Sequence, residues 1–544
     1  MTPRTVETQP YPDQKPGTAG LRKKVAVFRQ PNYLENFLQA VFDCAGDFSG
    51  ATLVAGGDGR YWNTEALEKV FAVAAGNGVA RVITGRGGLL STPAASHLIR
   101  LRKAAGGFLL TASHNPGGPD GDFGVKFDTA NGGQAPESLT DAVWQASAGI
   151  RRYQLVDLPS ADLDRVGIQH LGPLVLEVVD PVDDYAQLME TLFDFDRIHE
   201  LFAGGRFRMV FDAMHAVTGP YARRILEQRL GAPAGTVING RPLPDFGGHH
   251  PDPNPVDAAG LVEMMGRADA PELAAASDGD GDRNMILGPG IMVSPGDSLA
   301  VLAANAHLVP GYARGLAGVA RSMPTSRAVD AVARALDIPC FETPTGWRFF
   351  CNLLDAGLID LCGEESFGTS SSHTREKDGL WAVLFWLNLV AATGKGVAEL
   401  VRDHWRRFGR HAYARNDWFI SDADKARTVM AELESRLPGL PGTETPQGVV
   451  AAADSFTYED PVDGSVSANQ GLRLFLENEA RIVYRLSGTG TEGATLRVYL
   501  ERFLPAHGEH GASGPELTAD LADTAAGIAR IPEITGQSAP AGVI

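Results

Sequence analysis

Short apolar runs alternate with helical patterns from about residue 50 to residue 400, and this alternation constrains the fold more than any other feature of the sequence. Amphipathic helices are predicted at Tyr221–Leu230 and Ser326–Leu336. Strands that alternate with helices form sheets covered by helices, so the pattern predicts layered α/β domains. The clearest strand candidates are Thr52–Ala55, Arg81–Thr84, Gly107–Ala112, Phe207–Asp212, Leu273–Ser277 and Leu316–Arg321.

The pattern changes in the last quarter of the chain. Three short runs with partial alternation, Leu472–Glu477, Arg481–Leu486 and Thr495–Glu501, precede a helical pattern at Leu517–Ile528, which indicates a smaller α+β domain. A chain of 544 residues is too long for one core. We expect four domains, at residues 1–180, 181–300, 301–411 and 412–544. Roughly the first 15 residues and the last few are expected to be flexible.

Charge and cysteine content exclude several classes of protein. The 66 acidic and 48 basic residues give a formal charge of −18, which disfavours nucleic-acid binding because that affinity depends on Lys and Arg. The four cysteines have no CxxC spacing, and the N-terminus has no apolar signal segment. The most apolar stretch, Leu380–Ala392, falls short of the roughly 20 residues needed to span a bilayer. We expect a cytoplasmic protein without nucleic-acid or membrane partners, and a buried helix at Leu380–Ala392.

The first candidate loop, Thr111–Gly118, follows an apolar strand and contains Ser113 and His114. A serine at a strand end beside a histidine and glycines is a candidate nucleophile or phosphate carrier, although the same composition also suits a plain turn. The Gly-x-Ser-x-Gly motif of α/β-hydrolases is absent, because Thr111 and Asn115 stand at the glycine positions.

The second loop places three carboxylates at alternate positions, Asp278, Asp280 and Asp282, with glycines between them. The glycines let the backbone curl, so the oxygens can converge on a hard cation such as Mg²⁺. An EF-hand is excluded, since Arg283 and Pro289 replace its required Gly and Glu. The alternative is an acidic surface turn, but three like charges would repel one another without a cation.

The third loop, Cys362–Gly368, contains Glu364 and Ser366 between glycines. Carboxylate and hydroxyl side chains suit recognition of sugar hydroxyls, because a carboxylate accepts paired hydrogen bonds. A plain loop explains the composition equally well.

The fourth loop, Arg485–Thr491, is rich in Ser, Gly and Thr, and Arg497 lies beyond it. Its backbone N–H groups and arginines suit a phosphoryl group. The loop is not a P-loop, since the Walker Lys is absent and no helix follows. A hairpin turn with two surface arginines is the alternative.

Together the four loops resemble those of the α-D-phosphohexomutase family, most closely its glucose-specific phosphoglucomutase branch. The resemblance runs in family order from about residue 17 to residue 500. Outside the four loops it is carried by Gly17–Arg22, Gly56–Arg60, Gly121–Phe127, Asp245–Pro251, Ala320–Ser326, Pro344–Trp347 and Arg375–Gly379.

The resemblance implies four domains around a central cleft: three α/β domains with mixed sheets and a smaller α+β C-terminal domain. It implies reversible conversion of glucose 1-phosphate to glucose 6-phosphate through a phosphoserine enzyme and glucose 1,6-bisphosphate. It also implies one Mg²⁺ per chain, hexose phosphates as the small-molecule partners, and a monomer or homodimer.

The same resemblance assigns roles to individual residues. Ser113 is the phosphorylated carrier, and it joins Asp278, Asp280 and Asp282 around the metal. The residues around the reacting group are Arg22, His114, Lys126, Arg283 and Lys377, with Lys126 the leading general acid or base. The sugar and its distal phosphate would contact Thr345, Gly346, Glu364, Ser366, Arg485, Ser487, Gly488, Thr489 and Arg497.

Two positions depart from the family pattern. Ala19 stands where a serine is usual, and Arg348 stands where a lysine is usual.

Two other functions are disfavoured by the sequence. A relative acting on mannose or N-acetylhexosamine phosphates is disfavoured by the Glu-Glu-Ser-Phe-Gly sequence at residues 364–368. A non-catalytic scaffold is disfavoured because the carrier serine and the three aspartates are all present.

Overall fold

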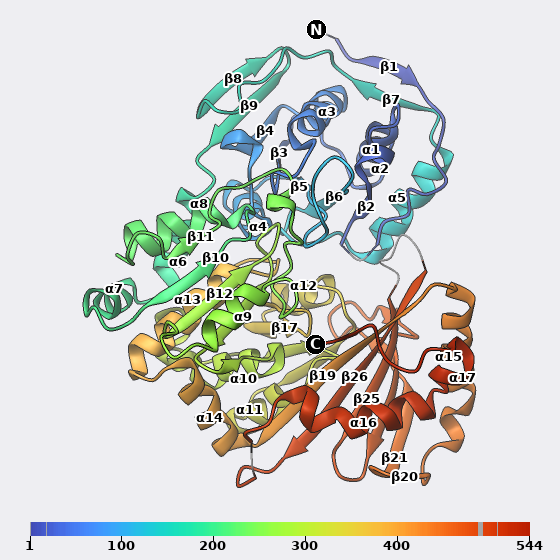
Figure 1. The fold of residues 1–544 in the computed structure, drawn as a ribbon. Helices are drawn as coiled ribbons and strands as arrows, with labels where there is room; N and C mark the ends of the chain where they lie inside the picture. Colours follow the sequence, from blue (N-terminus) through green and yellow to red (C-terminus); the bar gives the residue numbers. More distant parts are fainter. Residues whose placement is uncertain (1, 18, 488–492, 509) are drawn as a thin grey trace.

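The computed structural model describes residues 2–17, 19–487, 493–508 and 510–544, and its main sheets follow one another along the chain (Figure 1). The first sheet is mixed, because β3 pairs in parallel with β4 and β5, whereas β2 and β6 run antiparallel. Its strand order is β2 (Leu21–Lys24), β6 (Asp122–Thr129), β5 (Gly106–Leu110), β3 (Thr52–Gly57), β4 (Arg81–Gly85), β9 (Leu174–Val179) and β8 (Gly167–Leu171).

The second and third sheets are also mixed, with parallel central strands and an antiparallel edge. The second has the order β11 (Val237–Ile238), β10 (Met209–Asp212), β12 (Leu273–Ser277), β13 (Asn284–Gly288) and β14 (Ile291–Met292). The third has the order β16 (Cys340–Thr343), β15 (Val319–Ser322), β17 (Leu361–Glu364) and β18 (Gly368–Ser371). These three sheets confirm the expected α/β architecture.

The fourth sheet is antiparallel, and α15, α16 and α17 lie together beside it (Figure 1). Its order is β20 (Glu444–Thr445), β21 (Gly448–Ser455), β24 (Leu472–Leu476), β25 (Arg481–Ser487), β26 (Ala494–Leu504), β19 (Arg410–Ile420) and β27 (Gly542–Val543). The apolar residues of β24 alternate with half-buried ones and pack with α15 and α16 in a core of their own. The predicted α+β C-terminal domain is therefore confirmed.

The α-helices of the described residues have the following bounds. They are α1 (Val25–Phe28), α2 (Tyr33–Cys44), α3 (Asn63–Gly76), α4 (Thr92–Arg102), α5 (Glu137–Gly149), α6 (Asp183–Leu192), α7 (Phe195–Ala203), α8 (Thr218–Ala222), α9 (Ala259–Met265), α10 (Pro295–Asn305), α11 (Ala328–Leu336), α12 (Arg348–Asp355), α13 (Gly379–Thr393), α14 (Val397–Phe408), α15 (Ala423–Arg436), α16 (Gly514–Ile528) and α17 (Ile531–Thr535). Two small ladders, β1 (Arg4–Glu7) with β7 (Arg152–Leu155) and β22 (Tyr458–Glu459) with β23 (Val466–Ser467), complete the fold.

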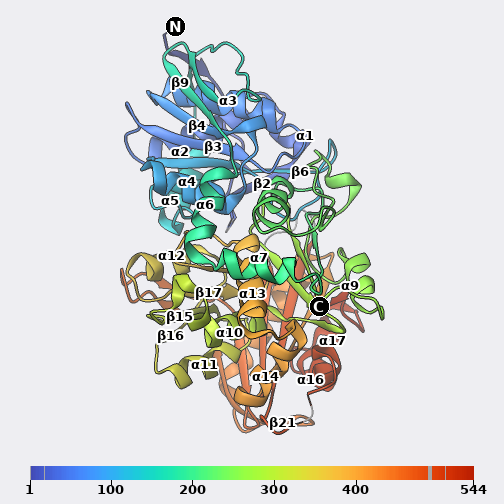
Figure 2. The ribbon, with the colours of Figure 1, turned by 90° about the vertical axis from the view of Figure 1, so that its left-hand side faces the viewer.

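Helix α13 is the apolar stretch predicted to be a buried helix, and the prediction is confirmed. Residues 379–390 are all buried, and its side chains belong to a core cluster that also contains residues of the first three sheets. Helix α13 contacts β12 and β13 of the second sheet and β18 of the third, and Figure 2 shows it near the middle of the molecule. Among the described residues, no single helix is long and apolar enough to cross a membrane; α13 and α14 pass the test only together, and they bend by 82°.

One expectation about local structure was incomplete and another was wrong. The predicted helix Tyr221–Leu230 is helical, but it begins within α8 and continues as a π-helix at Arg223–Arg229. The chain ends, expected to be flexible, contribute strands: β1 pairs with β7, and β27 pairs with β19. The backbone groups of these short strands are satisfied by strands more than a hundred residues away, which local composition cannot reveal.

Buried His404 on α14 makes folding sensitive to acid. Both ring nitrogens lack hydrogen-bond partners among the described residues, and burial lowers the pKa of His404 to about 3. Below about pH 6.5, His404 therefore binds a proton in the unfolded chain but not in the folded chain. We expect the free energy of unfolding to fall by about 1.4 kcal/mol for each pH unit below that value, from this residue alone.

The measurement is urea unfolding at several pH values between 7.5 and 5. His404→Phe, which preserves the ring packing against Phe408, should show a shallower loss of stability than the wild type. His307→Phe at an exposed histidine is the matched control and should keep the wild-type slope. Equal slopes for the wild type and His404→Phe would contradict the prediction.

Candidate active site

The loops after β5 and β12 come into direct contact, which brings the serine and the acidic motif together. The Ser113 hydroxyl donates to Asp278 Oδ2 at 2.8 Å, and both residues are buried. Gly279 lies against the serine loop so closely that a Cβ there would overlap the Ser113 carbonyl oxygen. The contact therefore requires a glycine at this position of the acidic loop.

The Ser113 backbone has a conformation that needs external support. Its φ of 52° is in the left-handed region, which non-glycine residues rarely adopt. Arg60 donates from its guanidinium to the Ser113 carbonyl oxygen at 2.8 Å. Arg60 is held by an ion pair with Asp58, both side chains fully buried, and Asp58 also accepts from the Thr111 hydroxyl at 2.7 Å. This buried pair fixes the serine loop in its strained shape.

Three buried carboxylates surround one point beside Ser113. Ligand oxygens of Asp278, Asp280 and Asp282 all lie within 4.8 Å of one another. Burial, followed by the charges of the other two aspartates, raises the pKa of Asp278 well above its usual value. One oxygen each of Asp280 and Asp282 is buried without a hydrogen-bond partner among the described residues. Such a set of unsatisfied hard oxygen donors fits a divalent cation.

Helix α4 supplies a contact to the acidic loop that the sequence did not indicate. The hydroxyl of Thr92, the first residue of α4, donates to Asp280 Oδ2 at 2.7 Å, and the Thr92 backbone N–H donates to the Asp280 carbonyl oxygen at 2.9 Å. These contacts orient Asp280 from the first sheet's side of the site.

Cationic and imidazole side chains surround the three aspartates. Lys377 Nζ lies 3.0 Å from Asp282 Oδ2, and Arg283 pairs with Asp252 at 3.0 Å. Burial lowers the pKa of Arg22, whose Nε has no partner among the described residues. Burial, together with Arg283 and Arg22, lowers the pKa of His114 well below its usual value, so this imidazole is neutral near pH 7.

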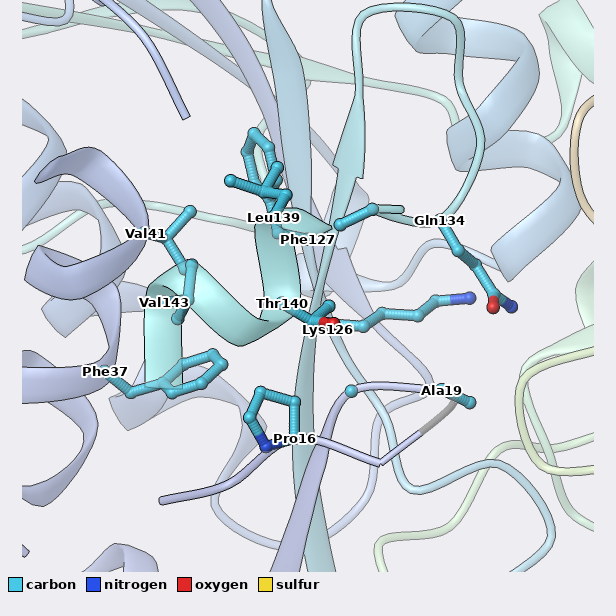
Figure 3. A pocket seen from close by; sticks show the side chains of 12 residues that line it. Pro16, Ala19, Phe37, Val41, Lys126, Phe127, Gln134, Leu139, Thr140 and Val143 are labelled. Carbon is cyan, nitrogen blue, oxygen red and sulfur yellow. The ribbon is translucent and has the colours of Figure 1, made fainter. Parts of the chain in front are cut away.

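Lys126 reaches the site from β6 past an apolar pocket. The pocket lies between α2, α5 and the segment before β2, and the Lys126 stem runs along it with the ammonium near Gln134 (Figure 3). The ammonium donates to Glu376 Oε1 at 2.8 Å. The charge of Glu376 and other nearby carboxylates outweighs burial and raises the pKa of Lys126. Lys126 is therefore an ammonium ion.

The predicted sugar-binding loop adjoins Lys377. Glu364 is buried at the end of β17 and accepts from the Gly346 backbone N–H at 2.8 Å. Burial raises the pKa of Glu364, and the charge of Lys377 opposes this. The Thr345 hydroxyl is buried without a hydrogen-bond partner among the described residues, whereas Ser366 is half-buried. Glu364 and Gly346 are thus held together by a hydrogen bond, close to the charge of Lys377.

The predicted distal phosphate residues lie on neighbouring strands of the fourth sheet. Arg485 on β25 pairs in register with Arg497 on β26, and Ser487 ends β25. The Arg485 guanidinium approaches Tyr499 Oη at 3.5 Å, and that hydroxyl donates to Glu365 Oε1 at 3.1 Å. This contact links the strand to the sugar-binding loop. Gly488 and Thr489 lie outside the described residues.

A second group of potential ligands does not form a comparable centre. His250, Asp252 and Asp257 are close together, but Asp252 pairs with Arg283 and His250 approaches Asp257 at 3.1 Å. These carboxylates are already compensated and partly exposed, so the three-aspartate loop is the better cation site.

The two departures from the family pattern leave the reacting residues in place. Ala19 lines the pocket beside Lys126 (Figure 3). Arg348 begins α12, and its guanidinium lies 3.8 Å from Glu137. Arg348 thus remains a cation at the start of the helix.

Sequence reasoning missed Glu376, Thr92 and the Asp58–Arg60 pair. The family resemblance could have indicated three of them, because Asp58, Arg60 and Glu376 lie inside segments that carry it. No local pattern indicates that a threonine at the start of α4 would contact the acidic loop.

Comparison with known domain families covers most of the chain. Models described as phosphoglucomutase/phosphomannomutase alpha/beta/alpha domains I, II and III match residues 13–154, 183–290 and 295–408. A model described as the phosphoglucomutase-1 C-terminal domain matches residues 410–541.

Individual relatives match over nearly their whole length. A phosphoglucomutase from Rhizobium radiobacter is 56% identical over 537 residues, covering 99% of each chain. A probable cytoplasmic phosphoglucomutase from Arabidopsis thaliana is 48% identical, covering 98% of each chain. The open form of the exocytosis-sensitive phosphoprotein pp63/parafusin from Paramecium, a phosphoglucomutase, superimposes with a TM-score of 0.91 at 44% identity, covering 100% of this chain and 99% of that one.

Proposed function

Because this chain belongs to the α-D-phosphohexomutase (phosphoglucomutase/phosphomannomutase) family, we propose that it interconverts α-D-glucose 1-phosphate and glucose 6-phosphate. The observation that carries the proposal is the 2.8 Å contact between the Ser113 hydroxyl and Asp278, within a loop of three buried aspartates. A nucleophilic hydroxyl beside a cation site is the arrangement that phosphoryl transfer requires.

Ser113 is the proposed carrier of the phosphoryl group. A sugar hydroxyl attacks the phosphorus of phosphorylated Ser113, so that a sugar O–P bond forms while the Ser113 Oγ–P bond breaks. The attacking hydroxyl loses a proton and the serine oxygen gains one. After the bound glucose 1,6-bisphosphate turns over, the reverse transfer from its other phosphate restores phosphoserine and releases the isomeric monophosphate.

Lys126 is the proposed general acid, since it is buried and charged. An ammonium that donates to the departing oxygen and recovers a proton from the attacking hydroxyl leaves the proton balance of each half-reaction unchanged. Arg22, His114, Arg283 and Lys377 would surround the transferring group, where their N–H groups can stabilise its negative charge.

Asp278, Asp280 and Asp282 would hold one Mg²⁺, with the Ser113 oxygen as a further ligand, because their unpaired buried oxygens match its preference for hard donors. The ion would supply positive charge next to the phosphoryl oxygens. The carboxylates themselves also keep Ser113, Lys377 and the loop backbone in place.

Substrate recognition is assigned to two groups. Thr345, Gly346, Glu364 and Ser366 would contact sugar hydroxyls, while the distal phosphate would meet a separate loop. The residues of that group are Arg485, Ser487, Gly488 and Thr489 of the loop, and Arg497 on the neighbouring strand. The Glu-Glu-Ser-Phe-Gly sequence at residues 364–368 favours glucose over mannose or N-acetylhexosamine phosphates.

We further propose domains at residues 1–180, 181–300, 301–411 and 412–544 around a shared site, a monomer or homodimer, and a cytoplasmic location. The ranges matched by the family models support the domain boundaries. The name of the Arabidopsis relative supports the cytoplasmic location.

The test is a coupled assay of the purified chain with Mg²⁺, glucose 1-phosphate and a trace of glucose 1,6-bisphosphate. Formation of glucose 6-phosphate with a kcat/KM well above that for mannose 1-phosphate and N-acetylglucosamine 1-phosphate is expected. Equal or greater efficiency with either of those sugars would overturn the assignment to glucose.

A further inference from the structure

Lys126 shares its buried environment with two carboxyl groups, Glu376 and Asp128. The Lys126 ammonium donates to Glu376 Oε1 at 2.8 Å, and Gln134 Nε2 donates to Glu376 Oε2 at 3.1 Å. Both oxygens of Glu376 are therefore occupied, and its side chain is completely buried. A carboxylate with two fixed donors cannot rotate away from the lysine.

The second carboxyl, Asp128, lies two residues beyond Lys126 on β6 and therefore on the same face of the strand. It is fully buried, and neither of its oxygens receives a hydrogen bond from a described residue. Burial, despite the opposing charge of Lys126, raises the pKa of Asp128 well above its usual value, and Glu376 raises it further. Burial and the neighbouring Glu376 charge therefore both favour the protonated form of Asp128.

The remaining charged and titratable groups around Lys126, Glu376 and Asp128 come from several elements. They are Asp280 and Asp282 in the acidic loop, Lys377 and Arg375 beside Glu376, and the Cys351 thiol on α12. The two aspartates favour the lysine cation. Burial raises the pKa of Glu376, and the charges of Lys126 and Lys377 oppose this rise. Among the described residues the Lys126 ammonium donates a hydrogen bond only to Glu376, so its other two N–H groups are available to a substrate.

We propose that Glu376 is a positioning residue that holds Lys126 as a charged acid facing the reacting group. This inference rests on the proposed function, because Lys126 acts only in the phosphoryl transfer. The physical reason is that a buried lysine without an anionic partner loses its proton, since burial disfavours the charged form. Glu376 keeps the third proton on the Lys126 ammonium and directs the other two N–H groups of that ammonium.

The test is the pH dependence of kcat in Glu376→Gln, which keeps the size of the side chain and removes its charge. The Lys126 pKa should fall, so the alkaline limb of the profile should move to lower pH by at least one unit. At pH 8 we expect kcat to drop by about 10²-fold, the lower range of a general acid's contribution, with KM nearly unchanged. Glu376→Asp should restore part of kcat and of the profile.

Asp355→Asn is the matched control, because Asp355 pairs with Arg375, the residue before Glu376, and lies partly exposed. Its profile should overlay that of the wild type. If Glu376→Gln instead lowers kcat without moving the alkaline limb, or raises KM alone, Glu376 is only structural and the inference is wrong. Thermal unfolding of each variant identifies a folding defect, and in that case Glu376→Asp decides the question by its profile.

The two proposals fail in different ways. An inactive wild type would refute the proposed function before any variant is compared. An active wild type whose pH profile is shared by Glu376→Gln would refute only the role of Glu376.

Discussion

Ser113→Ala is expected to lower turnover by about 10⁴-fold or more, the scale on which enzymes lose activity when a covalent nucleophile is removed. Its hydroxyl is the proposed acceptor and donor of the phosphoryl group, and no other described hydroxyl donates to Asp278. The variant should fold normally, because Arg60 holds the backbone of this loop through the carbonyl oxygen rather than through the side chain.

The measurement has two parts. Steady-state assays give the loss in kcat, and intact mass after incubation with glucose 1,6-bisphosphate shows whether one phosphoryl group is taken up per chain. Wild type and the exposed-site control Ser160→Ala should both be labelled, and Ser113→Ala should not. Labelling of Ser113→Ala at wild-type extent would show that the carrier is another residue.

Asp280→Asn is expected to lower kcat by about 10³-fold, equivalent to about 4 kcal/mol of transition-state stabilisation. One Asp280 oxygen accepts from Thr92, which an amide oxygen can still do, while the other is buried without a partner among the described residues. The substitution therefore removes a ligand charge from the proposed cation site with little other disturbance. Chelation of the wild type should have a comparable effect that added Mg²⁺ reverses.

Calorimetric titration with Mg²⁺ provides the direct readout, since Asp280→Asn should bind the ion more weakly than the wild type. The matched control is Asp257→Asn, in the other acidic group, where His250 and Asn254 already contact the carboxylate. It should retain wild-type affinity and turnover. Loss of Mg²⁺ binding in Asp257→Asn but not in Asp280→Asn would move the cation site to the second group.

The parts of the fold that sequence could predict are those with local causes. The apolar run Leu273–Ser277 is β12 to the residue, and the mostly apolar Leu380–Ala392 lies within α13. The serine and aspartate loops were predictable as sites because each directly follows a strand of an α/β sheet, and ligands of such sheets bind at the carboxyl ends of the strands.

The remainder depends on contacts between distant segments. Glu376 contacts Lys126 across 250 residues, and Thr92 contacts Asp280 across 188. Neither pairing has a period or a spacing that a local pattern could detect. The short terminal strands β1 and β27 were not predicted for the same reason, because each pairs with a strand that is distant in the sequence.

The contacts of Ser113 with Asp278 and of Lys126 with Glu376 have a consequence for biosynthesis. Ser113 is made 165 residues before Asp278, and at 5–20 residues per second this delay is roughly 8 to 33 s. Lys126 is made 250 residues before Glu376, a delay of roughly 13 to 50 s. During these intervals the serine loop has only the support of Asp58 and Arg60, which are made before it. The site is therefore completed only after the segment around Glu376 has been translated, although the strands of the first sheet are made much earlier.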